Sequence, residues 1–134
     1  MNEIIQILLL GAAADGTIDQ YEKFHILRMI KNINGSDKID EHRISNIQGD
    51  LMEKARIYPM DQLIQSITAL IPTDRQEQTY ALAVEVCLAN DIVENSEHDF
   101  LRLLRTSINI SDEVVNAIHL SAKLRHPMVG LGTN

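Results

Sequence analysis

The hydrophobic positions of this chain recur at the three- and four-residue spacing of α-helices, and strand-like alternation is almost absent. Two stretches are apolar on nearly every side, residues 4–14 near the start and residues 81–89 in the second half. A helix that is apolar all round is usually buried on all sides. We therefore expect an all-α fold in which helices over about 2–14 and 74–90 lie at the centre.

Five further segments have one apolar face and a polar remainder, the pattern of helices that pack around a core. Together with the two apolar helices they predict about seven helices. The five segments cover about 19–33, about 38–57, Pro59 to Pro72, about 96–108, and Ser111 to about Arg125.

Capping side chains mark several of the helix boundaries. Asp19 and Glu22 have the spacing of a capping box, in which each side chain accepts a hydrogen bond from a free backbone amide at the helix start. The same spacing at Asp50–Glu53, directly after Gly49, predicts a break in the third helix. It also recurs at Thr73–Gln76, where it predicts the start of the fifth.

The two halves of the chain resemble each other. A shift of 75 residues lays residues 14–22 over residues 89–97, and Ile26 over Leu101. Each half contains an apolar helix, a short acidic turn, an apolar anchor, a glutamate and an amphipathic helix. A single repeat at this long offset indicates a duplicated unit that packs around a pseudo-twofold axis, rather than a solenoid.

The repeated pattern resembles the tellurite-resistance TerB-like family over about residues 2–125. The family signature is a small residue, Asp-Gly, a variable residue, an aliphatic residue and then a glutamate, in both halves of an all-helical domain. The first copy is Ala14-Asp15-Gly16-Thr17-Ile18 with Glu22, whereas Asn90-Asp91 replaces Asp-Gly in the second. The resemblance implies two related helical units around two buried central helices, a link to stress responses, and metal binding through the acidic turns.

Two explanations fit the acidic turns. If the pseudo-twofold axis brings them together, their carboxylates are candidate ligands for a divalent cation such as Ca²⁺ or Mg²⁺. The alternative is that these side chains cap helices and that the Asp-Gly pair forms a turn. The candidate metal ligands are Asp15, Asp19, Glu22, Asp91, Glu94 and Glu97.

Composition narrows the class of protein. The formal net charge of −7, with 12 Lys and Arg against 19 Asp and Glu, argues against nucleic-acid binding, which needs a basic surface. The lone Cys87 lies in an apolar run, where a thiol behaves as a small hydrophobic side chain. The apolar stretches are shorter than the ~20 residues of a membrane span, and no basic segment precedes the first. We expect one cytoplasmic domain over 1–126, with a flexible tail over 127–134.

No catalytic constellation is apparent in the sequence. Glu22 and His25 form half of the Glu-x-x-His pairing used by di-iron bundles, and Glu85 offers one further carboxylate, but no second pair follows. The remaining histidines are expected on the surface. The sequence therefore predicts a non-enzymatic interaction or stress-response module that binds a protein partner or forms a homodimer through a helix face. The alternative is a divalent-metal-binding domain.

Overall fold

The computed structural model describes residues 2–15, 18–32, 39–88 and 95–126. Within these ranges the chain forms seven α-helices and no strand, which confirms the all-α prediction. A short 3₁₀ turn, η1 (Ala13–Asp15), follows the first helix. The helices are α1 (Asn2–Ala12), α2 (Gln20–Lys31), α3 (Glu41–Ile57), α4 (Met60–Thr68), α5 (Thr73–Cys87), α6 (Asn95–Ser107) and α7 (Asp112–Arg125).

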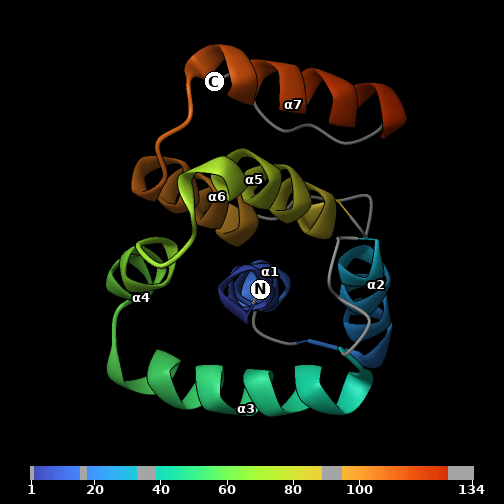
Figure 1. The fold of residues 1–134 in the computed structure, drawn as a ribbon, viewed down its shortest axis with the longest axis vertical. Coiled ribbons are helices and arrows are strands. Elements are labelled where there is room, and N and C mark those ends of the chain that lie inside the picture. Colours follow the sequence, from blue (N-terminus) through green and yellow to red (C-terminus); the bar gives the residue numbers. More distant parts are fainter. Residues whose placement is uncertain (1, 16–17, 33–38, 89–94, 127–134) are drawn as a thin grey trace.

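Helix α1 passes through the middle of the molecule, and α2, α3, α4, α5 and α6 all contact it (Figure 1). Its apolar side chains point in every direction, so the hydrophobic effect favours a position enclosed by other helices over any surface position. This agrees with the expected burial of the first helix. The buried residues of α1 are Ile4, Ile5, Ile7, Leu8, Leu9, Leu10, Gly11 and Ala12.

Helices α5 and α6 lie between α1 and α7, and α7 packs on α5 at the outside of the molecule (Figure 1). The second half of α5 is largely buried, including Tyr80, Val84 and Cys87. Its first half is more exposed, because the polar residues there face solvent. Within α7, only Val115 and Ala122 are buried, so this helix adds little to the core.

Two predicted helix starts are confirmed. The Asp19 carboxylate accepts a hydrogen bond from the Glu22 backbone amide at 2.8 Å, and the Glu22 carboxylate accepts one from the Asp19 amide at 3.1 Å. At the start of α7, the Ser111 hydroxyl accepts a hydrogen bond from the Val114 amide at 3.2 Å. Both arrangements satisfy backbone donors that have no partner within the helix.

Two other predicted boundaries are wrong. Helix α3 continues through Gly49, because that residue is exposed and an exposed glycine weakens a helix by only about 1 kcal/mol. Helix α5 has Pro72 rather than Thr73 as its N-cap, with no side-chain cap. Gln76 instead links two segments: its amide nitrogen donates to the Ile71 carbonyl at 3.4 Å, and its oxygen accepts from the Asn109 amide at 3.1 Å.

Several positions of the repeat detected in the sequence are buried in both halves. Residues 75 positions apart are buried in both halves, on α1 and α5 and again on α2 and α6. The matched buried pairs include Ile5 with Tyr80, Leu9 with Val84, Ala12 with Cys87, Glu22 with Glu97, and Ile26 with Leu101.

No helix in the described part of the chain is both long and apolar enough to cross a lipid bilayer. The longest, α3, is also one of the most polar, with only Ile44 and Leu51 buried. The predicted flexible tail, residues 127–134, lies outside the described residues.

Candidate functional site

Part of each acidic turn lies within the described residues. Asp19 is exposed, and its Oδ1 atom is engaged by the amide at the start of α2. Asp19 and Glu22 therefore cap α2, as the second explanation predicted. The backbone of Asp15 ends η1, whereas its side chain, together with Asp91 and Glu94, lies outside the described residues.

Glu22 and Glu97 are the two buried carboxylates of the described residues, 8% and 7% exposed. Each lies in the first turn of its helix, α2 or α6, where a negative charge interacts favourably with the helix dipole. Burial, and then the negative charge of Glu97, raise the pKa of the Cys87 thiol well above its ordinary range. Cys87 is consequently an uncharged core side chain, as its apolar context predicted.

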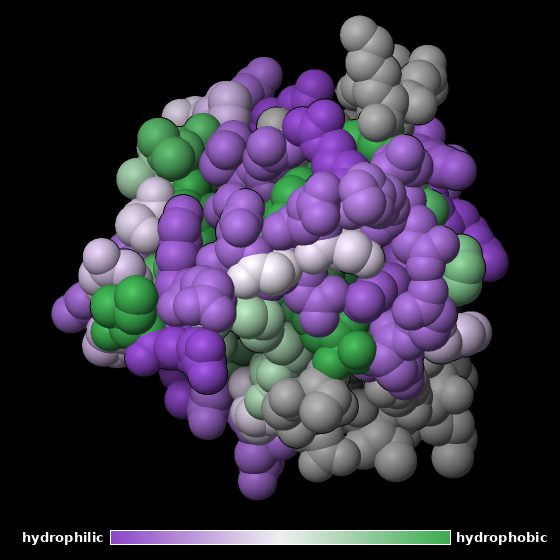
Figure 2. All heavy atoms as spheres, turned by 90° about the horizontal axis from the view of Figure 1, so that it is seen from below, coloured by the Kyte–Doolittle hydropathy of each residue, from purple (hydrophilic) through white to green (hydrophobic). Residues whose placement is uncertain are grey.

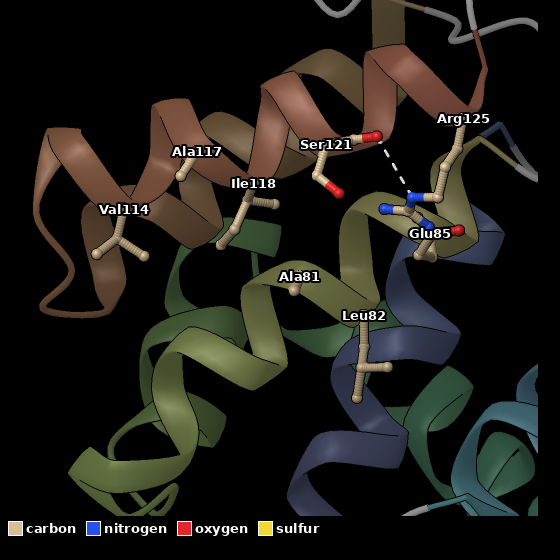
Figure 3. A pocket seen from close by; sticks show the side chains of 8 residues that line it. All are labelled: Ala81, Leu82, Glu85, Val114, Ala117, Ile118, Ser121 and Arg125. Carbon is tan, nitrogen blue, oxygen red and sulfur yellow. Dashed lines mark hydrogen bonds and ion pairs between the residues drawn. The ribbon is translucent and has the colours of Figure 1, made fainter.

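No group of three His, Cys, Asp or Glu side chains that could hold a metal ion occurs among the described residues. The di-iron pattern is likewise not assembled there. Glu85 lies on α5 and pairs with Arg125 at the end of α7 (Figure 3).

A groove of about 350 Å³ lies between α5 and α7 (Figure 3). We call it the α5–α7 groove. Leu82, Val114 and Ile118 provide most of its apolar wall, and Ser121 contributes a hydroxyl (Figure 3). The full set of lining residues is Ala81, Leu82, Glu85, Val114, Ala117, Ile118, Ser121 and Arg125.

The groove stays open because small side chains face it from both helices. Ala81 on α5 and Ala117 and Ser121 on α7 occupy positions where larger side chains would fill the space between the helix axes. Protein interiors are otherwise packed with few voids larger than a water molecule. An apolar space of this size, open to solvent, is therefore suited to receive side chains from another molecule.

An ion pair closes one end of the groove. Arg125 at the end of α7 reaches Glu85 Oε1 with its Nη1 atom, in an approach that lacks hydrogen-bond alignment (Figure 3). The His126 Nε2 atom lies 3.6 Å from the other carboxylate oxygen. Arg125 Nε also donates to the Ser121 carbonyl at 3.3 Å. These contacts fix the last turn of α7 over α5.

A second polar contact fixes the middle of α7. The Tyr80 hydroxyl lies 2.7 Å from His119 Nε2, and the two rings stack with their centroids 5.8 Å apart. Burial raises the pKa of Tyr80 to about 12, so the phenol stays protonated, and the tautomer of His119 sets which of the two groups donates. Burial, followed by the positive charge of Arg105 and the proximity of His98, lowers the pKa of His119 below its ordinary value.

Two leucines are exposed on the outer side of α7. Leu120 is 59% exposed and Leu124 is 75% exposed, one helical turn apart and on the side opposite the buried Val115 and Ala122. With the exposed Ala117 they form a row beside the α5–α7 groove. We call Ala117, Leu120 and Leu124 the α7 ridge.

The opposite end of the molecule has a different surface. On the face covered by α3, hydrophobic side chains lie in small separate groups among hydrophilic ones (Figure 2). Isolated apolar side chains of this kind are normal on protein surfaces, whereas a groove joined to an apolar ridge indicates an interaction site. The α5–α7 groove with the α7 ridge is therefore the candidate functional site.

The sequence predicts an interaction through a helix face but does not indicate which residues form this site. It placed His119 on the surface, which is wrong, because the ring is partly buried against Tyr80. The available signal was Tyr80 itself, since a tyrosine in an apolar helix needs a partner for its hydroxyl. No residue pattern in the sequence indicated that α7 packs on α5.

No protein-family model, curated protein or solved structure was found to match this chain. Its function is therefore inferred from the geometry of the described residues and from the repeated pattern of the sequence.

The lowered pKa of His119 predicts a specific pH dependence of stability. Below its ordinary pKa of 6.5, the unfolded chain binds a proton at this residue more readily than the folded chain does. The stabilisation is therefore complete above pH 6.5 and is lost as the pH falls through the native pKa. Urea denaturation between pH 8 and pH 5 should show that the free energy of unfolding falls more for the wild type than for His119→Gln.

The comparison with His119→Gln isolates this residue, because the carboxylates titrate in both proteins. Glutamine also retains an amide that can bond the Tyr80 hydroxyl. A difference in stability between the two proteins that stays constant across this pH range would show that His119 titrates normally.

Proposed function

We propose that this chain is a non-enzymatic, TerB-like interaction module of a stress response, and that it binds the apolar ridge of a helix in the α5–α7 groove. The observation that carries the proposal is the groove itself. Apolar side chains from two helices line it, and the Glu85–Arg125 ion pair closes one end. An amphipathic helix laid in such a groove buries side chains at every third or fourth residue.

The matched burial of the two halves supports the TerB-like part of the proposal. Glu22 and Glu97 follow the acidic turns of the pattern, and both are buried in the first turn of a helix. Leu9 and Val84 have equivalent buried positions on the two apolar helices. A duplicated helical unit accounts for both correspondences with one arrangement of helices.

A cationic amphipathic peptide of leucine and lysine tests the binding of a helix, since the net charge of the chain is −7. The peptide should shift the methyl resonances of Leu82, Val114 and Ile118 in a saturable manner. Ser121→Leu should weaken the binding about tenfold or more, because the added side chain fills the groove. The measurement is a titration followed by methyl NMR spectroscopy.

Ser66→Leu on α4 is the matched control, because Ser66 is also an exposed helical serine. It should leave the affinity for the peptide unchanged. Saturable shifts confined to another face, or no saturation at millimolar peptide, would contradict the proposed groove.

The second candidate function is binding of a divalent cation by the acidic turns. The observation that favours it is that Glu22 and Glu97 are buried at equivalent positions of the repeated pattern, each in the first turn of a helix. It ranks second because Asp19 and Glu22 already cap α2. Ca²⁺, Mg²⁺ or Mn²⁺ at millimolar concentration should raise the melting temperature if this function is correct, and Glu97→Gln should abolish the effect. An unchanged melting temperature would remove it.

A further inference from the structure

We infer that the partner of the α5–α7 groove is a second copy of this chain, bound through two antiparallel α7 helices related by a twofold axis. The inference rests on the proposed function, because it names the partner of the same groove. It follows from three properties of α7: the order of its apolar residues, the position of its charges, and the overlap between groove and ridge.

The α7 ridge is complementary to itself in size. Ala117, Leu120 and Leu124 follow one another at intervals of three and four residues, so they lie on one side of the helix. In an antiparallel pair, Ala117 of one copy can lie opposite the partner's Leu120. A twofold axis then repeats the same small-to-large contact on the other side of the interface.

The charges along α7 favour the same antiparallel arrangement. The first turn contains the acidic residues Asp112 and Glu113, and the last turn contains the basic residues Lys123 and Arg125. The register that sets Ala117 opposite the partner's Leu120 places Glu113 opposite the partner's Leu124. Lys123 is the next residue, so its long side chain can bring the ammonium group to the Glu113 carboxylate. A parallel pair would instead bring like charges together at both ends, which is unfavourable.

The ridge and the groove share Ala117, so one partner helix can contact both. A leucine placed over Ala117 enters the mouth of the groove, where Val114 and Ile118 form the apolar wall (Figure 3). Each copy thus contributes leucines to the groove of the other. Leu120 and Leu124, now 59% and 75% exposed, would be covered in the dimer.

The expected dimer is weak. Helix α7 has 14 residues, so the shared helix pair is about 21 Å long at 1.5 Å per residue. A helix pair of this length is expected to bury less than the ~1,200 Å² of a stable complex, which is typical of weak, transient interfaces. The test therefore spans about 10 to 500 µM chain, on the order of a weak dissociation constant. Sedimentation equilibrium of the full chain over this concentration range should detect the dimer.

Leu120→Asp combined with Leu124→Asp should weaken dimerisation about tenfold or more, since each carboxylate would be buried in the apolar interface. Leu70→Asp is the matched control, because Leu70 is 68% exposed in the turn after α4. It should leave the dissociation constant unchanged. Both substituted sites face solvent in the monomer, so circular dichroism should show unchanged helicity.

Charge reversal tests the antiparallel register. Glu113→Lys or Lys123→Glu alone should weaken dimerisation about threefold to tenfold, because each places like charges together. The double variant Glu113→Lys/Lys123→Glu should restore the affinity to about the wild-type value. The double variant places a positive charge near the N-terminus of α7 and a negative charge near its C-terminus, and both are unfavourable for the helix dipole. A restored affinity for the second copy therefore cannot come from a more stable α7.

A chain that stays monomeric at 500 µM would overturn the inference, as would a dimer that is insensitive to the two leucine substitutions. Failure of the double charge variant to restore affinity would overturn the antiparallel arrangement. Binding of the leucine and lysine peptide by a monomeric chain would refute the second copy as partner and leave the proposed function intact. Loss of both dimer and peptide binding would refute both.

Discussion

Replacement of Leu9 by alanine is expected to lower the free energy of unfolding by about 2–5 kcal/mol. Leu9 is 0% exposed and lies on α1, which is surrounded by α2–α6. The substitution removes most of the Leu9 side chain. The surrounding helices also pack on one another, so they cannot all move inward, and a cavity remains at the centre of the fold. Urea denaturation followed by circular dichroism measures the difference.

Leu70→Ala is the control for this substitution. Leu70 is 68% exposed, so the same change in chemistry should alter the free energy of unfolding by less than about 0.5 kcal/mol. The total stability of a domain of this size is about 5–15 kcal/mol, so Leu9→Ala should remove a large share of it. Equal effects of the two substitutions would mean that α1 is not enclosed.

Replacement of Gly11 by alanine should destabilise the protein, although alanine favours helices by about 1 kcal/mol over glycine. A Cβ atom at Gly11 would lie 2.8 Å from Cε2 of the Phe100 ring, closer than carbon atoms normally approach. Phe100 is 2% exposed, so its ring has little room to move. Overpacking of this kind costs about 1–3 kcal/mol, which exceeds or cancels the gain in propensity.

Replacement of Gly49 by alanine should instead stabilise the protein. No atom lies within 4 Å of a Cβ added there, and the residue is an exposed position of α3. Gly49→Ala should therefore raise the free energy of unfolding by about 0.5–1 kcal/mol. Thermal and urea denaturation of both variants measures the contrast.

A compensating variant identifies the cause at Gly11. Phe100→Leu removes the ring that the new methyl group would meet, so Gly11→Ala should cost less in the Phe100→Leu background than in the wild type. Equal costs in the two backgrounds would show that the close approach of α1 and α6 does not explain the effect.

Much of the architecture was predictable because it depends on local chemistry. The all-round apolar character of residues 4–12 requires burial wherever the helix lies, and the capping box of Asp19 and Glu22 acts within one turn. The predicted break at Gly49 failed because propensity is a weak signal, which the packing of Ile44 and Leu51 overrides. Predictions from local sequence patterns were thus correct where no tertiary contact favoured a different structure.

The candidate site was not predictable in the same way. Leu120 and Leu124 occur at helical spacing that would equally suit a core face, and only the packing of α7 through Val115 and Ala122 turns them outward. The groove depends on three small residues, Ala81, Ala117 and Ser121, that come together from two helices. No pattern within either helix indicates that meeting.

The amino-acid sequence by itself determined that this protein is helical, where most of its helices begin and end, and that the first helix is buried at its centre. The other helix expected there, over about 74–90, is largely buried only in its second half. These properties follow from the spacing of apolar residues and from hydrogen bonds within a few residues of one another. The tertiary structure alone decided which face of α7 is exposed, that His119 meets Tyr80, and that α5 and α7 leave a groove between them. These features depend on contacts between residues distant in the chain, whose free energies no local pattern records.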